Sequence, residues 1–464
     1  MKIKHLFFLF IFFLFFKAVR SNALEVQGYV SQGFLYSNQY NYLADTDGGT
    51  FQFNEMGINF LQKTTDDTFI GMQISARDLG DIGNDEPYID WALADWRISD
   101  ILGLRFGLLK IPVGFYNETR DIDMLRTSVL LPSGVYIELL RDAWDGMQGF
   151  GLYGAYSHSF LGAIDYQLAV GTGEIQDDSS TSKMFNSVFD DESIFNVRNF
   201  QVDKILTWGI QWHLPFNQFS LGNTFFFTDW DNIADLDLTR PAIGEIPIFF
   251  PGENPLFPNG HPGFNGCDAI DIHQVFPIDV KNLVSYTLSA SIEMNHIFFS
   301  TEYFHLQLEG DAHLPLFQYA NDTATEIINY GGIKTFEKEI EGYYIAANRR
   351  IADPIEIGAY YSWITNNALD KHGSDAAKEP GNHDYSAWLR DYCISILFEI
   401  SDQWSFKVEG HLMDGHAFLF IDDNPAPEKI IMPEGGNYSK ISTNEAAYPD
   451  RYWYMMNAKI TFTF

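Results

Sequence analysis

The chain has 464 residues, of which 46% are hydrophobic and 16% aromatic, and its formal net charge is -33. Its mean hydropathy is only -0.13, and after residue 23 no apolar run reaches the ~20 residues that a transmembrane helix needs. These values exclude a helical membrane protein, and the acidic balance argues against nucleic-acid partners. High aromatic content with average hydropathy favours a wall in which apolar and polar residues alternate.

Residues 1–23 have the pattern of a secretory signal peptide. Lys2 and Lys4 precede an apolar run, 6–16, that is too short to span a bilayer. Small residues at positions 21 and 23 suit a cleavage site. We therefore expect a single mature domain over residues 24–464. The alternative is an uncleaved anchor.

About sixteen segments alternate between apolar and polar residues with the period of a β-strand. In the last one, every even position from 452 to 464 is apolar or aromatic, and most odd positions are polar. Many segments are longer than the ~5–6 residues typical of soluble strands, and aromatic residues gather at their ends, as at membrane interfaces. The segments are 25–36, 52–63, 67–77, 88–98, 103–109, 147–157, 161–171, 201–214, 217–228, 283–295, 297–309, 339–350, 354–366, 388–400, 404–414 and 451–464.

The connections between these segments alternate between short and long. A soluble sandwich also has alternating strands, but it has no reason to sort its loops in this way. Transmembrane barrels have short periplasmic turns and long external loops, so we predict an all-β, antiparallel transmembrane barrel with both termini on the periplasmic side. The short turns lie near 64–66, 99–100, 158–159, 215–217, 351–353 and 401–403, and the long loops near 37–51, 78–87, 110–146, 172–200, 229–282, 310–338, 367–387 and 415–450.

The third long loop, 110–146, is the candidate constriction of the pore. A sixteen-stranded barrel has a wide lumen, and this loop carries apolar residues such as Leu130 and Leu131 that need a surface to cover them. Opposed charges across a constriction would sort solutes by charge. An ordinary loop with structural ion pairs is the open alternative. The candidate constriction residues are Lys110, Glu118, Arg120, Asp121, Asp123, Arg126, Glu138, Arg141 and Asp142, and the candidate lumen-wall cations are Arg77, Arg105, Lys407 and Lys459.

The same loop carries a family resemblance. Its segments 110–121 (KIPVGFYNETRD), 126–132 (RTSVLLP) and 141–142 (RD) resemble the constriction region of bacterial porins in the phosphate-selective porin superfamily. The resemblance implies a homotrimer of sixteen-stranded barrels with the third loop folded into the lumen. The C-terminal Phe464 resembles the terminal aromatic residue that barrel-assembly machinery reads. The resemblance does not imply phosphate as the solute, because members with that role carry a dense basic ladder and this chain is acidic.

Three functions remain open. The first is passive diffusion of small hydrophilic solutes across the bacterial outer membrane, in contact with lipid and lipopolysaccharide. The second is a channel specific for phosphate, dicarboxylates or peptides. The third is a barrel enzyme or adhesin, although no G-x-S-x-G or H-E-x-x-H motif occurs.

We expect no cofactor. Asp45 and Asp47 form only a weak calcium candidate, because later ligands are not clear. His411 and His416 are five apart, an odd spacing that puts them on opposite faces of a strand, so we expect no metal site from this pair. The two cysteines, Cys267 and Cys393, are expected to be isolated small residues.

Overall fold

The computed structural model describes residues 23–80, 82–176, 179–182, 195–215, 218–238, 248–249, 272–320, 327–378, 383–419 and 450–464. The predicted signal peptide lies almost entirely outside these residues, as does Cys267. No helix in the described part of the chain is long and apolar enough to cross a membrane.

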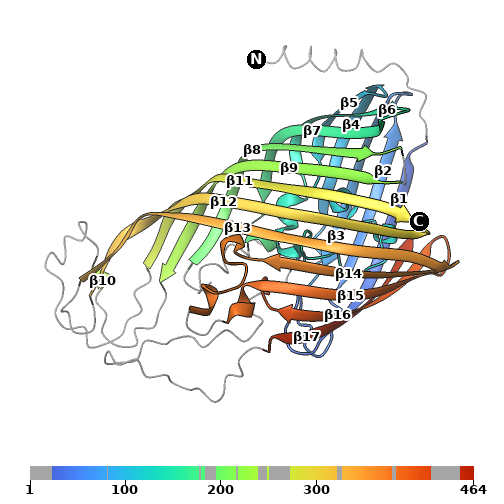
Figure 1. Cartoon of the computed structure of the whole chain (residues 1–464). Coiled ribbons are helices and arrows are strands. Elements are labelled where there is room, and N and C mark those ends of the chain that lie inside the picture. Colours follow the sequence, from blue (N-terminus) through green and yellow to red (C-terminus); the bar gives the residue numbers. More distant parts are fainter. Residues whose placement is uncertain are drawn as a thin grey trace, which may run out of the picture.

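Sixteen long strands form one closed antiparallel barrel, which confirms the predicted fold (Figure 1). Each strand pairs with the next one along the chain, and β17 pairs with β1 to close the ring. A two-residue strand, β10 (Ile248–Phe249), joins β12 at its far end. The long strands are β1 (Glu25–Ser37), β2 (Asn54–Lys63), β3 (Thr68–Asp78), β4 (Tyr88–Ser99), β5 (Leu102–Leu109), β6 (Met147–His158), β7 (Gly162–Ile175), β8 (Phe195–His213), β9 (Ser220–Leu238), β11 (Ile272–Met294), β12 (Ile297–Ala320), β13 (Ile327–Ala352), β14 (Ile355–Thr365), β15 (Trp388–Glu399), β16 (Trp404–Gly415) and β17 (Tyr452–Thr463).

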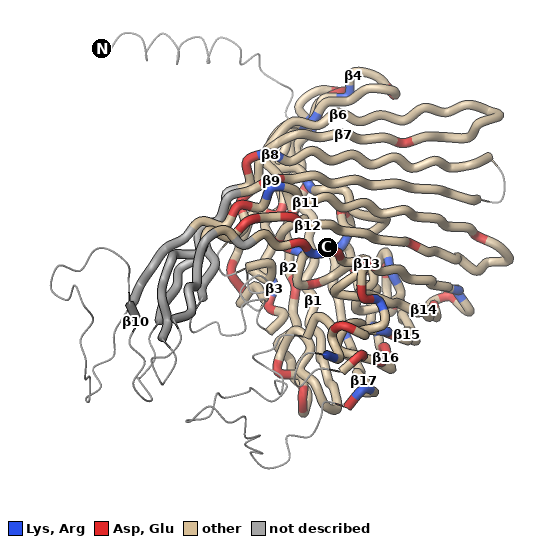
Figure 2. The backbone as a smooth tube through the Cα atoms, turned by 60° about the vertical axis from the view of Figure 1, so that its left-hand side comes forward, with Lys and Arg blue, Asp and Glu red and all other residues tan. Residues whose placement is uncertain are grey.

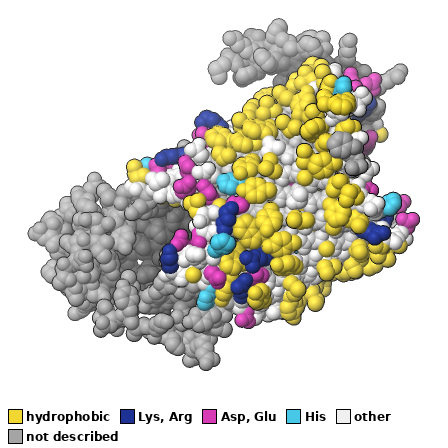
Figure 3. Space-filling model, viewed as in Figure 1, with side chains coloured by type: hydrophobic (Ala, Val, Ile, Leu, Met, Phe, Trp, Pro, Cys, Tyr) yellow, Lys and Arg dark blue, Asp and Glu magenta, His cyan; other side chains and the backbone are white. Residues whose placement is uncertain are grey.

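Side chains alternate between the two faces of the wall, as predicted. In β17, Tyr452 and Met456 are exposed on the outside, while Asn457 and Lys459 are buried on the inside. Hydrophobic side chains cover much of the outer surface in Figure 3, and charged and histidine side chains form a band along its loop side. The turn-side halves of β7 to β12 carry few charged residues (Figure 2).

Two rows of aromatic residues mark the edges of this apolar surface. The loop-side belt consists of Tyr286, Tyr303, Tyr343, Tyr361, Tyr392, Tyr454 and Tyr36, on β11 to β15, β17 and β1. The turn-side belt includes Phe398, Phe406, Trp404, Phe462 and Phe464. Along β17, Phe462 follows Tyr454 by eight positions. At ~3.3 Å per residue and a strand tilt of ~40°, this corresponds to about 20 Å along the barrel axis. An apolar band near this height suits the hydrocarbon core of a bacterial outer membrane.

The wall is much higher on one side than on the other. Strands β11, β12 and β13 have 23, 24 and 26 residues, whereas β2 to β6 have between 8 and 12. The long strands extend well past the rest of the barrel in Figure 1. The segments predicted for β11, β12 and β13 are about eleven or twelve residues too short at their loop-side ends.

The loop 110–146 lies inside the barrel. It contains four short 3-10 helices, η1 (Asn117–Thr119), η2 (Asp123–Leu125), η3 (Glu138–Leu140) and η4 (Asp142–Trp144). Its apolar side chains Ile111, Val135 and Trp144 are fully buried, and the Trp144 ring packs edge-on against Phe304 of β12 at 5.5 Å. The expectation that a surface covers these apolar residues is therefore correct, and the inner wall of the barrel supplies it.

Candidate functional site

Asp123 is the first of two charge centres that fix the loop to the wall. Its carboxylate lies 3.1 Å from Lys407 Nζ and 3.4 Å from Lys459 Nζ, and it accepts a hydrogen bond from Thr461 at 2.9 Å. Lys407 also donates to the backbone carbonyls of Asp123 and Ser128. Burial by itself would raise the pKa of Asp123, but the two ammonium groups outweigh it and hold the pKa well below the usual range.

Arg141 is the second charge centre. Its guanidinium donates to Glu55 of β2 at 2.9 Å and to Asp121 at 3.1 Å, and it lies 3.6 Å from Glu138. Glu138 in turn pairs with Arg120 at 2.6 Å. Glu55 also accepts from Lys459 at 2.7 Å, so the two centres form one continuous network. Burial would raise the pKa of Asp121, but Lys110 and Arg141 lower it further than burial raises it.

The network continues toward the third and fourth strands. Lys110 pairs with Asp121 and, at 2.7 Å, with Asp90 of β4. Arg77 of β3 pairs with Asp142 and Asp145. No ion pair among the described residues joins this Arg77 group to the rest of the network; counted together, the two hold seven cations and seven acids, so their formal charges balance. They are Arg77, Lys110, Arg120, Arg126, Arg141, Lys407 and Lys459 with Glu55, Asp90, Asp121, Asp123, Glu138, Asp142 and Asp145.

Two wall carboxylates hold the loop by its backbone. Glu302 of β12 accepts from the Phe115 N–H at 2.8 Å and from the hydroxyl groups of Tyr136 and Tyr344. Glu409 of β16 accepts from the N–H groups of Val129 at 2.7 Å and Leu130 at 3.1 Å. Neither acid was among the predicted site residues, although Glu409 stands on a strand face that the alternation identifies as inward.

The predicted site residues separate into two groups. All but two belong to the buried network, whereas Glu118 and Arg105 lie outside it. Glu118 is exposed and accepts from Gln167 of β7 at 2.7 Å. Arg105 of β5 is one-third exposed, pairs with Asp95 at 2.7 Å and lies over the ring of Tyr153. A small cavity of about 10 Å³ beside Arg120 and Glu138 has room for roughly one water molecule, too little for a solute.

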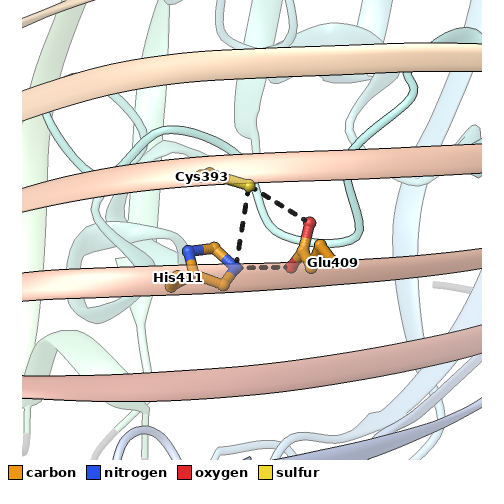
Figure 4. A group of neighbouring side chains, drawn as sticks. All are labelled: Cys393, Glu409 and His411. Carbon is orange, nitrogen blue, oxygen red and sulfur yellow. Dashed lines mark hydrogen bonds and ion pairs between the residues drawn. The ribbon is translucent and has the colours of Figure 1, made fainter.

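Cys393 is not isolated, contrary to expectation. Its Sγ lies 3.9 Å from His411 Nε2 and 3.9 Å from a Glu409 oxygen, and all three side chains point inward from β15 and β16 (Figure 4). Among the described residues, this is the one group of three or more Cys, His, Asp or Glu side chains close enough to share a metal ion. Asp45 and Asp47 are both exposed and belong to no such group in the described part of the chain.

The same residues contain a thiol–imidazole–carboxylate series, because Asp391 accepts from His411 Nδ1 at 2.9 Å. A hydrolase needs its nucleophile paired with a base in this order. Here, however, Glu409 occupies the Nε2 side of His411 at 2.9 Å, and Cys393 is only 2% exposed. A substrate could not reach the sulfur in this arrangement.

No protein-family model matches the chain, and no curated protein matches it significantly. Among solved structures, it is similar to the outer membrane channel DcaP of Acinetobacter baumannii, with 9% identity over 95% of this chain and 97% of that chain and a TM-score of 0.49. It is also similar to OmpF of Salmonella typhi (9% identity, 96% and 98% coverage, TM-score 0.49) and to an anion-selective porin from Comamonas acidovorans (10% identity, 95% and 99% coverage, TM-score 0.48). These likenesses concern overall architecture, and the barrel itself is established by its strand pairing.

Proposed function

We propose that this chain is a bacterial outer-membrane porin that lets small hydrophilic solutes and ions diffuse passively through its barrel. The observation that carries the proposal is a closed barrel, apolar outside, with one long loop fastened across its interior. Lipid offers no partner for backbone N–H and C=O groups, and a closed barrel leaves none unpaired. A loop anchored in this way narrows a wide lumen. Its side chains are held in place, so they do not move to close the passage.

The position of the narrowest passage follows from where the loop is fastened. Among the described residues, its hydrogen bonds and ion pairs reach β2, β3, β4, β9, β12, β14, β16 and β17. Between β5 and β8 they reach Gln167 of β7 and the segment 179–182 that follows β7. Small residues such as Gly149 and Gly151 occupy inward positions on β6. We place the water-filled passage between the loop and the β5–β7 wall, with Glu118 and Arg105 beside it, because the inward Ile205 and Thr207 of β8 are buried. The buried network shapes this passage from behind.

The balance of charges in the network indicates which solutes the channel accepts. A phosphate-selective channel needs cations that are free to bind an anion, whereas the loop and wall cations of the network each have an acidic partner within it. This favours general diffusion of small solutes over a dedicated phosphate or dicarboxylate channel. No cofactor enters the proposal.

We further propose a homotrimer that associates through the low wall. The tyrosines of the loop-side belt lie on β11 to β15, β17 and β1. At comparable height the described outward residues of β3, β4, β6 and β7 include Ile74, Ile89, Phe150 and Val170, all exposed. Tyrosine and tryptophan favour the lipid–water interface. On this face the exposed Trp96 and Tyr156 lie near the turns, so an apolar loop-side part without such residues suits a neighbouring protein. The remaining outer surface would contact lipid and lipopolysaccharide, and Phe464, half exposed, would be read by the assembly machinery.

The test is planar-bilayer recording of the purified chain across a salt gradient. Discrete, ohmic conductance steps support the porin, and the reversal potential gives its ion preference. Arg120→Ala with Arg126→Ala tests whether these two arginines set that preference directly. Folded, heat-modifiable protein that gives no conductance would overturn the proposal. Assays of the same sample on lipid and peptide substrates would then test the enzyme alternative, and cross-linking would test the trimer.

A further inference from the structure

The Cys393 group comes together through strand register. Cys393 on β15 lies directly opposite His411 on β16, and Glu409 is two residues before His411 on the same inward face. Asn457 on β17 lies directly opposite Glu409. These side chains are between 2% and 5% exposed. The loop 110–146 covers them through the Val129 and Leu130 bonds to Glu409.

The Nε2 atom of His411 lies between a carboxylate and an amide that also bind each other. Glu409 Oε1, an acceptor, lies 2.9 Å from Nε2, and Asn457 Nδ2, a donor, lies 3.3 Å from it. Asn457 Nδ2 also donates to Glu409 Oε1 at 3.0 Å. The Asn457 Oδ1 atom is buried without a hydrogen-bond partner. A half-turn of this amide would exchange its nitrogen and oxygen and point the oxygen toward His411 and Glu409, where a cation would bind all three groups.

The spacing of the three side chains is close to that of a tetrahedral metal site. Zinc bonds of ~2.3 Å to sulfur and ~2.0–2.1 Å to nitrogen and oxygen place the ligand atoms about 3.3–3.6 Å apart. The separations here are 3.9 Å from Sγ to Nε2, 2.9 Å from Nε2 to Oε1 and 3.9 Å from Sγ to the other carboxylate oxygen, Oε2. One ligand atom from each residue lies within 4.8 Å of the other two, and a rotation of the carboxylate brings a single oxygen toward both Sγ and Nε2. The Asp391 contact to Nδ1 is the outer carboxylate that metal-binding histidines commonly have.

From this geometry we propose that Cys393, His411 and Glu409 bind one zinc ion within the lumen wall, with the turned Asn457 oxygen as the fourth ligand. Thiolate, imidazole and carboxylate together are a typical zinc donor set. The ion displaces the Cys393 thiol proton and any proton on His411 Nε2, and both leave to solvent. Glu409 keeps its bond to the Val129 N–H through its other oxygen. The ion would therefore join β15, β16 and β17 to the loop at one point.

The test uses the full-length protein, stripped with a chelator and loaded with Co²⁺ in place of zinc. We expect one cobalt per chain and a thiolate-to-cobalt charge-transfer band in the wild type. Cys393→Ser should abolish the band, whereas the matched control Cys267→Ser, which removes the other thiol of the chain, should keep it. Asp391→Asn should weaken zinc binding by about 10–100-fold, as outer-shell substitutions do.

The Cys267→Ser protein also decides the matter if Cys393→Ser does not fold. Cys393 is the one thiol left in it, so added cobalt should give the charge-transfer band and the chelator should remove that band. The inference is overturned if the folded wild type binds no cobalt, or if its charge-transfer band survives Cys393→Ser. Because neither readout depends on conductance, failure here would leave the porin proposal standing.

Discussion

Two sectors of the barrel interior make different contacts with the loop 110–146. Toward β16, β17, β2 and β3, the loop meets several charged side chains, all of them buried: Lys407, Glu409, Lys459, Glu55 and Arg77. Toward β5–β7, its bond among the described strand residues is the one that Gln167 donates to Glu118, and its other bonds on this side go to the segment 179–182 after β7. A buried charge with a partner at ~3 Å has little field left at a distance, whereas an exposed charge beside water acts on passing ions. The charges of one long loop can thus stabilise the architecture on one side and set ion selectivity on the other.

The largest effect should come from removing a buried cation of the anchored sector. Lys407→Met removes a cationic partner of Asp123 at a site where the lysine side chain is fully buried. Breaking a buried pair costs about 3–5 kcal/mol, so we expect a lower unfolding free energy in denaturant and noisy, enlarged conductance as the loop loosens. Lys204→Met is the matched control: this lysine is 73% exposed and pairs with Asp229, and an exposed pair is worth roughly 0–1 kcal/mol. Equal losses in the two variants would contradict the distinction between sectors.

The anchored sector shows what a sequence can and cannot reveal. Alternation predicted the sixteen strands, and it predicted that Arg77, Lys407 and Lys459 point inward. It did not predict their partners, because pairing across the barrel depends on register and closure. Lys459 and Glu55 are 404 residues apart in sequence and touch only because β17 closes onto β1, beside β2. Cys393 and His411 likewise stood on inward rows, but nothing in the sequence placed them opposite each other.

The sequence predicted β11, β12 and β13 too short, and this error has a different cause. Beyond Tyr303 of the loop-side belt, the outward residues of β12 become polar, as at His305 and Gln307, while the inward Leu306 and Leu308 are buried. The strand leaves the apolar band there, so its polarity inverts. A search for apolar outward rows stops at that inversion and assigns the rest of the strand to a loop.

A smaller loss should follow when a neutral anchor is removed. Tyr136→Phe deletes the hydroxyl group that donates to the buried Glu302, which keeps its bonds from Tyr344 and the Phe115 N–H. Removing one hydrogen bond to a buried carboxylate lowers the unfolding free energy by about 1–3 kcal/mol. Tyr392→Phe, at a half-exposed belt position, should change the unfolding free energy little. If chemical denaturation shows the reverse order, Glu302 does not anchor the loop.

Mild acid should leave the anchored sector intact. Ion pairing holds the pKa of Asp123 below its usual range. A carboxyl group with a lowered folded-state pKa stabilises the protein fully above its unfolded value of ~3.9, and that contribution is lost only as the pH falls through the lowered value. The stability difference between wild type and Asp123→Asn should therefore be constant from pH 7 to about 5 and shrink below about pH 4. Denaturant midpoints measured across this range check it; a difference that already shrinks at pH 6 would contradict the pairing.

The smallest effect, and the one that most directly tests the sparse sector, is on ion preference. Glu118→Gln removes an exposed negative charge, so the ratio of anion to cation permeability should rise; Arg105→Gln should lower it. An interaction of ~1 kcal/mol in water at close range allows at most about a fivefold change. Arg97→Gln is the control, because this exposed side chain pairs with Asp100 at a short turn away from the loop. Reversal potentials decide the matter. If Arg97→Gln shifts them as far as Glu118→Gln, the passage does not run along β5–β7, since a charge beside the narrowest point must act more strongly than one at the barrel rim.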